Sequence, residues 1–108
     1  MKVFIVIRTS FEALHCWPGC PYPEVSYLKS QHRHVFYVEM KWLVVDVDRE
    51  KEFILLKTEV NDWLKENWER KNLGSKSCEM LAVELMERFN ADYVSVFEDN
   101  ENGAEVLK

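Results

Sequence analysis

The sequence predicts one α+β domain, with a four-stranded antiparallel sheet that carries two helices on one face in the order ββααββ. Three observations predict it. Segments rich in β-branched and aromatic residues lie towards both ends of the chain. Two segments with apolar residues at helical spacing lie between them. The length of 108 residues, 47% of them hydrophobic, suits one small core and one domain over residues 1–108.

The N-terminal half contains two expected strands. Residues 2–16 (KVFIVIRTSFEALHC) are rich in β-branched and aromatic residues, which favour a strand. Residues 17–30 hold all three prolines and one of the three glycines, and this composition predicts a loop. Residues 32–47 alternate at first and predict a second strand. The two strands would pair as a wide hairpin.

Two helices are expected in the middle of the chain. The first should run from about residue 52 to 69, and its apolar stripe is Phe53, Leu56, Val60 and Trp63. Residues 74–77 break the chain, and Ser77 suits the start of a second helix that ends near Asn90.

The C-terminal segment supplies the remaining strands. Residues 93–98 (YVSVFE) predict a third strand, residues 99–103 a tight turn, and residues 104–107 a short fourth strand. Strands joined by turns, with two helices between the pairs, predict a mostly antiparallel sheet with both helices on one face.

The composition of the chain indicates which classes of partner and which cellular compartment to expect. The formal net charge is −5 and Lys and Arg are scattered, which disfavours nucleic-acid binding. The apolar run at residues 3–7 is too short for a signal peptide, and no stretch approaches a membrane span. Three cysteines without a signal sequence predict reduced thiols in the cytoplasm. A domain this small is marginally stable, so a homo-oligomer is expected.

The three histidines form a candidate metal site. His32 and His34 are two residues apart, so on a strand they point to the same face with Cβ atoms roughly 6–7 Å apart. His15 lies at the end of the expected partner strand, beside them in a hairpin. Three imidazole ligands favour zinc and leave a fourth position for water or substrate, an arrangement typical of catalytic sites.

Other interpretations of these residues stay open. The histidines of an H-x-H pair are often unrelated surface residues. Cys16 and Cys20, in C-x3-C spacing, could instead join two histidines in a closed Cys2His2 structural site, or could be ordinary loop thiols. A globular domain without any metal is a further possibility, and imidazole ligands also suit metals other than zinc.

Five motifs run in order along nearly the whole chain. They are Phe11-Glu12-Ala13-Leu14-His15, His32-Arg33-His34-Val35-Phe36, the segment 46–64, Ser77-Cys78-Glu79-Met80-Leu81-Ala82, and Val96-Phe97-Glu98-Asp99. Together they resemble motifs of the 6-pyruvoyl-tetrahydropterin synthase and 6-carboxy-tetrahydropterin synthase family. The resemblance implies the tunnelling fold, in which subunits pair their sheets into a barrel. It also implies that His15, His32 and His34 bind zinc and that Glu98 grips the edge of a pterin or purine-like ring.

The chain departs from this family at three places. Leu28 stands near the position of the family's catalytic cysteine, although Cys20 lies in the same loop. No histidine follows His34, so the family's Asp-His pair after the first helix has no counterpart. Arg33 replaces a glycine between the two histidines of the H-x-H pair. Binding is therefore better preserved than catalysis.

Two functions follow as expectations. The resemblance implies a zinc-dependent lyase or synthase acting on a reduced pterin or related heterocycle, in tetrahydropterin or 7-deazaguanine (queuosine) biosynthesis. In that case Cys20, or else Cys16, would act as general base and Glu98 would bind the substrate. The alternative is a catalytically degenerate member that binds a purine- or pterin-like ligand without turnover. Cys20 as an inert thiol and Glu98 as a solvated carboxylate are the corresponding plain alternatives.

Overall fold

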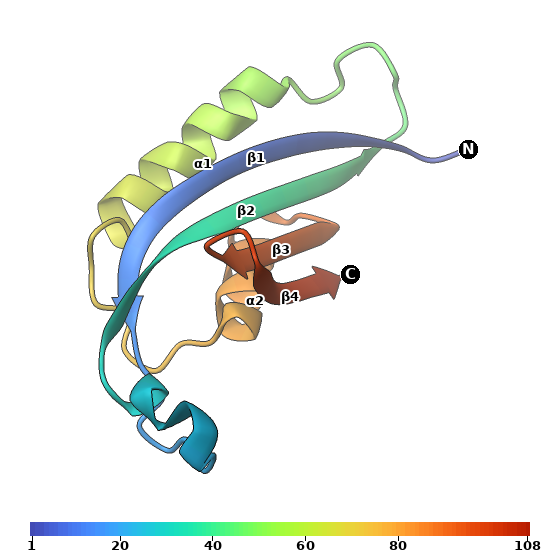
Figure 1. The fold of residues 1–108 in the computed structure, drawn as a ribbon. Coiled ribbons are helices and arrows are strands. Elements are labelled where there is room, and N and C mark those ends of the chain that lie inside the picture. Colours follow the sequence, from blue (N-terminus) through green and yellow to red (C-terminus); the bar gives the residue numbers. More distant parts are fainter.

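The computed structural model describes residues 1–108 and confirms the α+β fold (Figure 1). All pairings in the sheet are antiparallel, and its strand order is β1-β2-β3-β4. Both long helices lie on the same side of this sheet. The elements in chain order are β1 (Val3–His15), the 3-10 helix η1 (Pro23–Lys29), β2 (His32–Val44), α1 (Phe53–Asn67), α2 (Cys78–Phe89), β3 (Tyr93–Glu98) and β4 (Asn102–Leu107).

The hairpin of β1 and β2 is longer than the rest of the sheet. Its strands pair along their whole length, from Val3 opposite Val44 to His15 opposite His32. Strand β3 has six residues, and its pairing with β2 ends where Glu98 lies opposite Phe36. The end of the hairpin that carries His15 and His32 therefore extends beyond β3, and the two strands curl away from β3 there (Figure 1).

One face of the sheet and the two helices enclose the core. Side chains alternate between faces along each strand, so every second residue of β2 from Phe36 onward is buried. Helix α1 contributes Val60 and Leu64 to this core, and α2 contributes Leu81 and Leu85. Eighteen buried residues form this single cluster. Neither helix combines the length and the apolar composition needed to cross a membrane.

The helix ends follow from local chemistry. The Glu52 carboxylate accepts from two backbone N–H groups of the first turn of α1, and the Ser77 hydroxyl accepts from that of Met80, as expected for a helix that begins after Ser77. Helix α2 ends at Phe89, and the left-handed backbone of the next residue, Asn90 (φ 50°), closes the last turn.

Most element ends lie within two residues of those expected, and three differences have a local cause or add an element. Strand β2 ends at Val44 rather than 47, because the next two backbone N–H groups donate to the Glu50 carboxylate instead of a strand. Strand β4 begins at Asn102 rather than 104, and Gly103 permits this because a Cβ there would lie 2.1 Å from the Val96 carbonyl oxygen. The expected loop 17–30 contains η1.

The connection between the helices lies along the end of β1. The Arg70 backbone N–H donates to the Glu12 carbonyl (2.6 Å), and that of Leu73 donates to the Leu14 carbonyl (2.7 Å). The Cys16 N–H in turn donates to Gly74 (2.9 Å). These bonds fix residues 70–76 against the strand end that carries His15.

Candidate metal centre

The register of the hairpin brings the three histidines together. His15 and His32 are direct partners in the β1–β2 ladder, and His34 is paired with Ala13. All three side chains share one face, and the small Ala13 leaves room for the imidazole opposite. The ring centroid of His15 lies 4.5 Å from that of His32 and 5.4 Å from that of His34. The ring centroids of His32 and His34 are 5.0 Å apart.

Two of the imidazoles are oriented by backbone carbonyls. His15 Nδ1 lies 2.9 Å from the Lys76 carbonyl oxygen, in the connection fixed against β1. His32 Nδ1 lies 2.9 Å from the carbonyl oxygen of Ser30. A carbonyl oxygen can only accept, so Nδ1 of each ring carries the proton and donates, and Nε2 presents its lone pair.

The third imidazole is oriented by a carboxylate. His34 Nδ1 lies 2.6 Å from Asp99 Oδ2, while Asp99 Oδ1 accepts the Val35 backbone N–H at 3.1 Å. Metal-binding histidines typically donate their second nitrogen to a carbonyl or carboxylate, which fixes the ring and raises its basicity. All three histidines of this chain have such a partner.

Glu98 reaches the same point from the neighbouring strand. It ends β3 opposite Phe36, and His34 is the next residue of β2 on that face, so the two side chains are diagonal neighbours. Glu98 Oε2 lies 2.7 Å from His34 Nε2 and 3.4 Å from His15 Nε2. The carboxylate thus faces the lone-pair side of both rings.

The donor set fits a metal ion. One ligand atom from each histidine and one from Glu98 all lie within 4.8 Å of one another. The Nε2 atoms of His15 and His34 are buried, and no hydrogen bond of proper geometry satisfies them. Buried polar atoms without a partner are rare, and a cation among these four lone pairs would satisfy them. Three imidazoles and a carboxylate suit zinc and related divalent ions.

In the absence of a metal, the groups of this cluster shift one another's pKa values. Burial lowers the pKa of His15, but the Glu98 carboxylate and the Lys76 carbonyl outweigh it and raise the pKa above its ordinary value of 6.5. The neighbouring His15 imidazole holds the pKa of Glu98 below its ordinary value of 4.5, despite burial. Without a metal, a proton takes the place of the cation between these groups.

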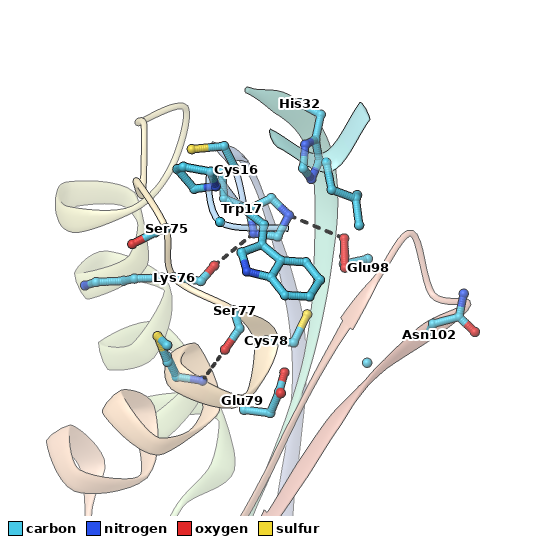
Figure 2. A pocket seen from close by; sticks show the side chains of 16 residues that line it. Cys16, Trp17, His32, Ser75, Lys76, Ser77, Cys78, Glu79, Glu98 and Asn102 are labelled. Carbon is cyan, nitrogen blue, oxygen red and sulfur yellow. Dashed lines mark hydrogen bonds and ion pairs between the residues drawn. The ribbon is translucent and has the colours of Figure 1, made fainter. Parts of the chain in front are cut away.

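A cavity of about 840 Å³ adjoins the cluster (Figure 2). The N-terminus of α2 with the residues before it, the loop after β1, the end of β3 and the start of β4 surround it. His15, His32 and Glu98 form one part of its wall, and the side chain of Trp17, 44% exposed, faces the same space. Its lining consists of residues 15–19, Leu28, His32, residues 75–80, Glu98 and residues 102–103.

The two loop cysteines occupy different environments. Cys16 lines the cavity. Cys20 is buried outside the lining, and its sulfur lies 3.8 Å from the carbonyl oxygens of Tyr22 and Val25. The group of four close donors contains neither sulfur, so the structure does not bring the Cys2His2 set together. The catalytic role predicted for Cys20 stays a prediction.

Cys78, which the sequence did not single out, lies in the cavity wall beside Glu98. Burial and the carboxylates of Glu98 and Glu79 raise the pKa of its thiol to about 12. The thiol is therefore protonated at neutral pH, although it sits at the first residue of α2, where a helix dipole favours a thiolate.

The positions that depart from the resembled family are also visible. Leu28 lines the cavity as an apolar residue. The Arg33 side chain points to the opposite face of the sheet, where it pairs with Glu12 at 2.7 Å. Arg33 therefore leaves the histidine cluster undisturbed.

The sequence missed one member of this site and gave another member a different role. Asp99 belongs to the expected tight turn at residues 99–103, yet it orients His34. Glu98 is expected to bind substrate, yet it also contacts the histidines. The expected third strand ends at Glu98, but both carboxylates reach the histidines only in the register that pairs Glu98 with Phe36, which the sequence does not specify.

No protein-family model and no curated protein matches the sequence of this chain. Among solved structures, the chain is similar to 6-pyruvoyl tetrahydropterin synthase of Caenorhabditis elegans, with a TM-score of 0.79 and 15% identity. The alignment covers 100% of this chain and 96% of that chain. At this identity the similarity establishes the architecture, and this chain therefore has the fold of a pterin synthase.

Proposed function

We propose that this chain is a zinc-dependent, pterin synthase-like protein that acts on a reduced pterin or a related 7-deazapurine precursor. The single observation that carries the proposal is the convergence of four metal-type donors at the wall of a cavity of about 840 Å³. The fold shared with a pterin synthase at a TM-score of 0.79 supports the substrate class.

His15, His32 and His34 would hold the zinc through Nε2. When bound, zinc polarises oxygens of a substrate side chain and acidifies the neighbouring protons. The carbonyls of Lys76 and Ser30 keep two of the rings in the tautomer that this requires.

The cavity wall suits a flat heterocycle. Trp17 offers an aromatic surface against which a planar ring can stack. Glu98 lies in the same wall and would accept two N–H groups from the edge of the ring, a charge-assisted contact. The two side chains together favour a pterin or purine-like ring over a flexible aliphatic substrate.

Two cysteines of the loop after β1 are the candidates for the proton-transfer group. Cys20 would act as general base only after its thiol leaves the carbonyls of Tyr22 and Val25. Cys16, which already lines the cavity, would need no such movement. A substitution of each cysteine by serine, with turnover as the readout, distinguishes the two.

A second function is favoured by one observation: with zinc on all three histidines, the chain has no further imidazole to move a proton. The Cys78 thiol is also held in its protonated form. The same pocket would then bind a pterin- or purine-like ligand without converting it.

Self-association completes the proposal. The face of the sheet without helices exposes apolar side chains, among them Val6, Tyr37 and Leu43, at 38–43% of their surface. A second copy that covers this face would bury them, and the resemblance implies a barrel of paired sheets. Light scattering of the purified protein checks the assembly.

The deciding experiment combines metal analysis with a turnover assay. Purified protein should contain one zinc per chain, and the His32→Ala variant should lose it. Gln31→Ala, an exposed neighbour on the same segment, is the matched control. Conversion of dihydroneopterin triphosphate by the zinc-loaded protein supports the enzyme. Saturable ligand binding without conversion supports the binder, and the absence of zinc contradicts both.

A further inference from the structure

We propose that Glu98 is the fourth protein ligand of the metal in the ligand-free protein, so that the resting centre is closed and opens only when this carboxylate leaves. The inference rests on the proposed function for the metal itself. It adds a second role to the residue that grips the heterocycle, and it makes the two roles mutually exclusive.

The distances point to coordination. Glu98 Oε2 and His34 Nε2 are separated by 2.7 Å, and both atoms carry lone pairs when Nδ1 holds the ring proton. Such atoms repel unless a proton or a cation lies between them. In a tetrahedral site with bonds of about 2.0–2.2 Å, neighbouring ligand atoms are about 3.4 Å apart. Glu98 Oε2 already lies 3.4 Å from His15 Nε2, and a small rotation of the flexible glutamate would lengthen its contact to His34.

Contacts of the next residue fix the backbone at Glu98, while its side chain stays free to rotate. Its neighbour Asp99 has its backbone N–H on the Val35 carbonyl at 2.7 Å and its carboxylate on the Val35 N–H at 3.1 Å. The same carboxylate orients His34. The turn after β3 therefore positions both the imidazole of His34 and the backbone of Glu98. The two side chains approach each other from the adjacent strands β2 and β3.

Charge favours the same arrangement. Three neutral imidazoles leave a divalent ion with its full charge beside a largely apolar core, whereas one carboxylate halves that charge. Burying an ion without compensation is costly. Glu98 is the one carboxylate in the group of four close donors, while Glu79 lines the cavity outside that group.

The consequence is a coupling between ligand binding and the metal. Glu98 borders the cavity, so it can turn from the histidines towards a heterocycle without crossing other elements. A ring that takes the carboxylate would leave an open position on the metal at the moment when its own side chain is nearby. Water would be excluded from that position in the resting protein.

Cobalt(II) substitution tests the inference, because the visible spectrum of cobalt reports its coordination. The wild-type protein, with four protein ligands, should show a spectrum independent of pH between about 7 and 9. In Glu98→Ala a water replaces the carboxylate, and its ionisation near neutral pH should produce a titration. Affinity for the metal should fall at least tenfold, since the loss of an outer-shell partner alone costs roughly 10–100-fold.

Two further variants exclude trivial explanations. Glu98→Gln keeps the shape of the side chain and should titrate as the alanine variant does. Glu79→Ala removes the other cavity carboxylate and should behave as the wild type. If the wild-type spectrum titrates and Glu98→Ala binds cobalt equally well, the inference is overturned while the three-histidine site stands. If no variant binds cobalt, the metal proposal and the inference fall together.

Discussion

The two ends of the β1–β2 hairpin follow one rule of alternation but carry different chemistry. Towards the start of β1, the inward positions hold Ile7, Met40 and Trp42, which belong to the core between the sheet and the helices. At the other end the same face carries His15, His32 and His34. There β3 has ended at Glu98, and a cavity takes the place of helix packing. The polar side chains therefore lie on the core face where its apolar covering ends.

The largest expected effect separates the two ends by metal binding. His34→Ala removes a ligand that contacts both carboxylates of the site, so affinity for zinc should fall by more than about a hundredfold. Isothermal titration or chelator competition measures it. Arg33→Ala, one residue away but on the opposite face, should bind zinc normally. Unchanged affinity in His34→Ala would contradict the site.

The core end should respond in stability instead. Met40 is fully buried, and Met40→Ala should lower the free energy of unfolding by about 2–5 kcal/mol, through lost contacts and the cavity that remains. Denaturant unfolding of the metal-free protein gives this value. Leu107→Ala, at a position 77% exposed, should cost less than about 0.5 kcal/mol. Loss of zinc binding by folded Met40→Ala would show that the two ends are not independent.

Asp99 tests whether the orientation of His34 matters. Asp99→Asn keeps a residue that tolerates the left-handed backbone at this position (φ 52°). The substitution removes the negatively charged carboxylate that lies beside His34 Nδ1. Zinc affinity should fall roughly 10–100-fold. Glu101→Gln removes an exposed carboxylate from the same turn and serves as the control. Equal zinc affinities of Asp99→Asn and Glu101→Gln would show that Asp99 does not help His34 to bind zinc.

The stability of the metal-free protein and the extra stability gained from zinc should depend on pH in opposite directions. The raised pKa of His15 gives the metal-free protein stability that is present below pH 6.5 and is lost as pH rises through the folded value. The lowered pKa of Glu98 gives stability that is present above pH 4.5 and is lost as pH falls through the folded value.

The His15–Glu98 contribution to metal-free stability should therefore be greatest between about pH 4.5 and 6.5. Zinc must displace the proton of His15, so its affinity should fall about tenfold per pH unit below the pKa of this ring. Thermal unfolding with and without zinc, from pH 5 to 8, should show the stabilisation by zinc growing as pH rises. A stabilisation that shrinks with rising pH would contradict this assignment.

The smallest expected effect concerns the cavity wall. Trp17→Ala should weaken the binding of a pterin about three- to tenfold, which corresponds to the loss of one stacking contact. Trp17→Phe should retain most of the affinity. Tyr27→Ala, an exposed aromatic of the same loop outside the cavity lining, is the control. Equal pterin affinity in all three variants would remove Trp17 from the site.

Much of the fold could be predicted because its signals are local. Composition predicted the first hairpin strand and alternation the second, apolar spacing predicted both helices, and Ser77 predicted the start of α2. Local patterns were weaker where a distant contact decides: Gly103 lets β4 begin two residues early because its partner strand approaches closely. The site divides in the same way. His15, His32 and His34 were predictable from strand period and hairpin pairing, whereas Asp99 was not.

The sequence by itself determined which face of each strand carries apolar or imidazole side chains, because the alternation of a strand is a property of its own backbone. Only the tertiary structure decided where β3 stops along β2, and so placed Glu98 beside His34 and Asp99 behind it. Register between strands far apart in the chain is set by the packing of the whole core. The carboxylates of the site therefore depend on contacts that no short stretch of sequence contains.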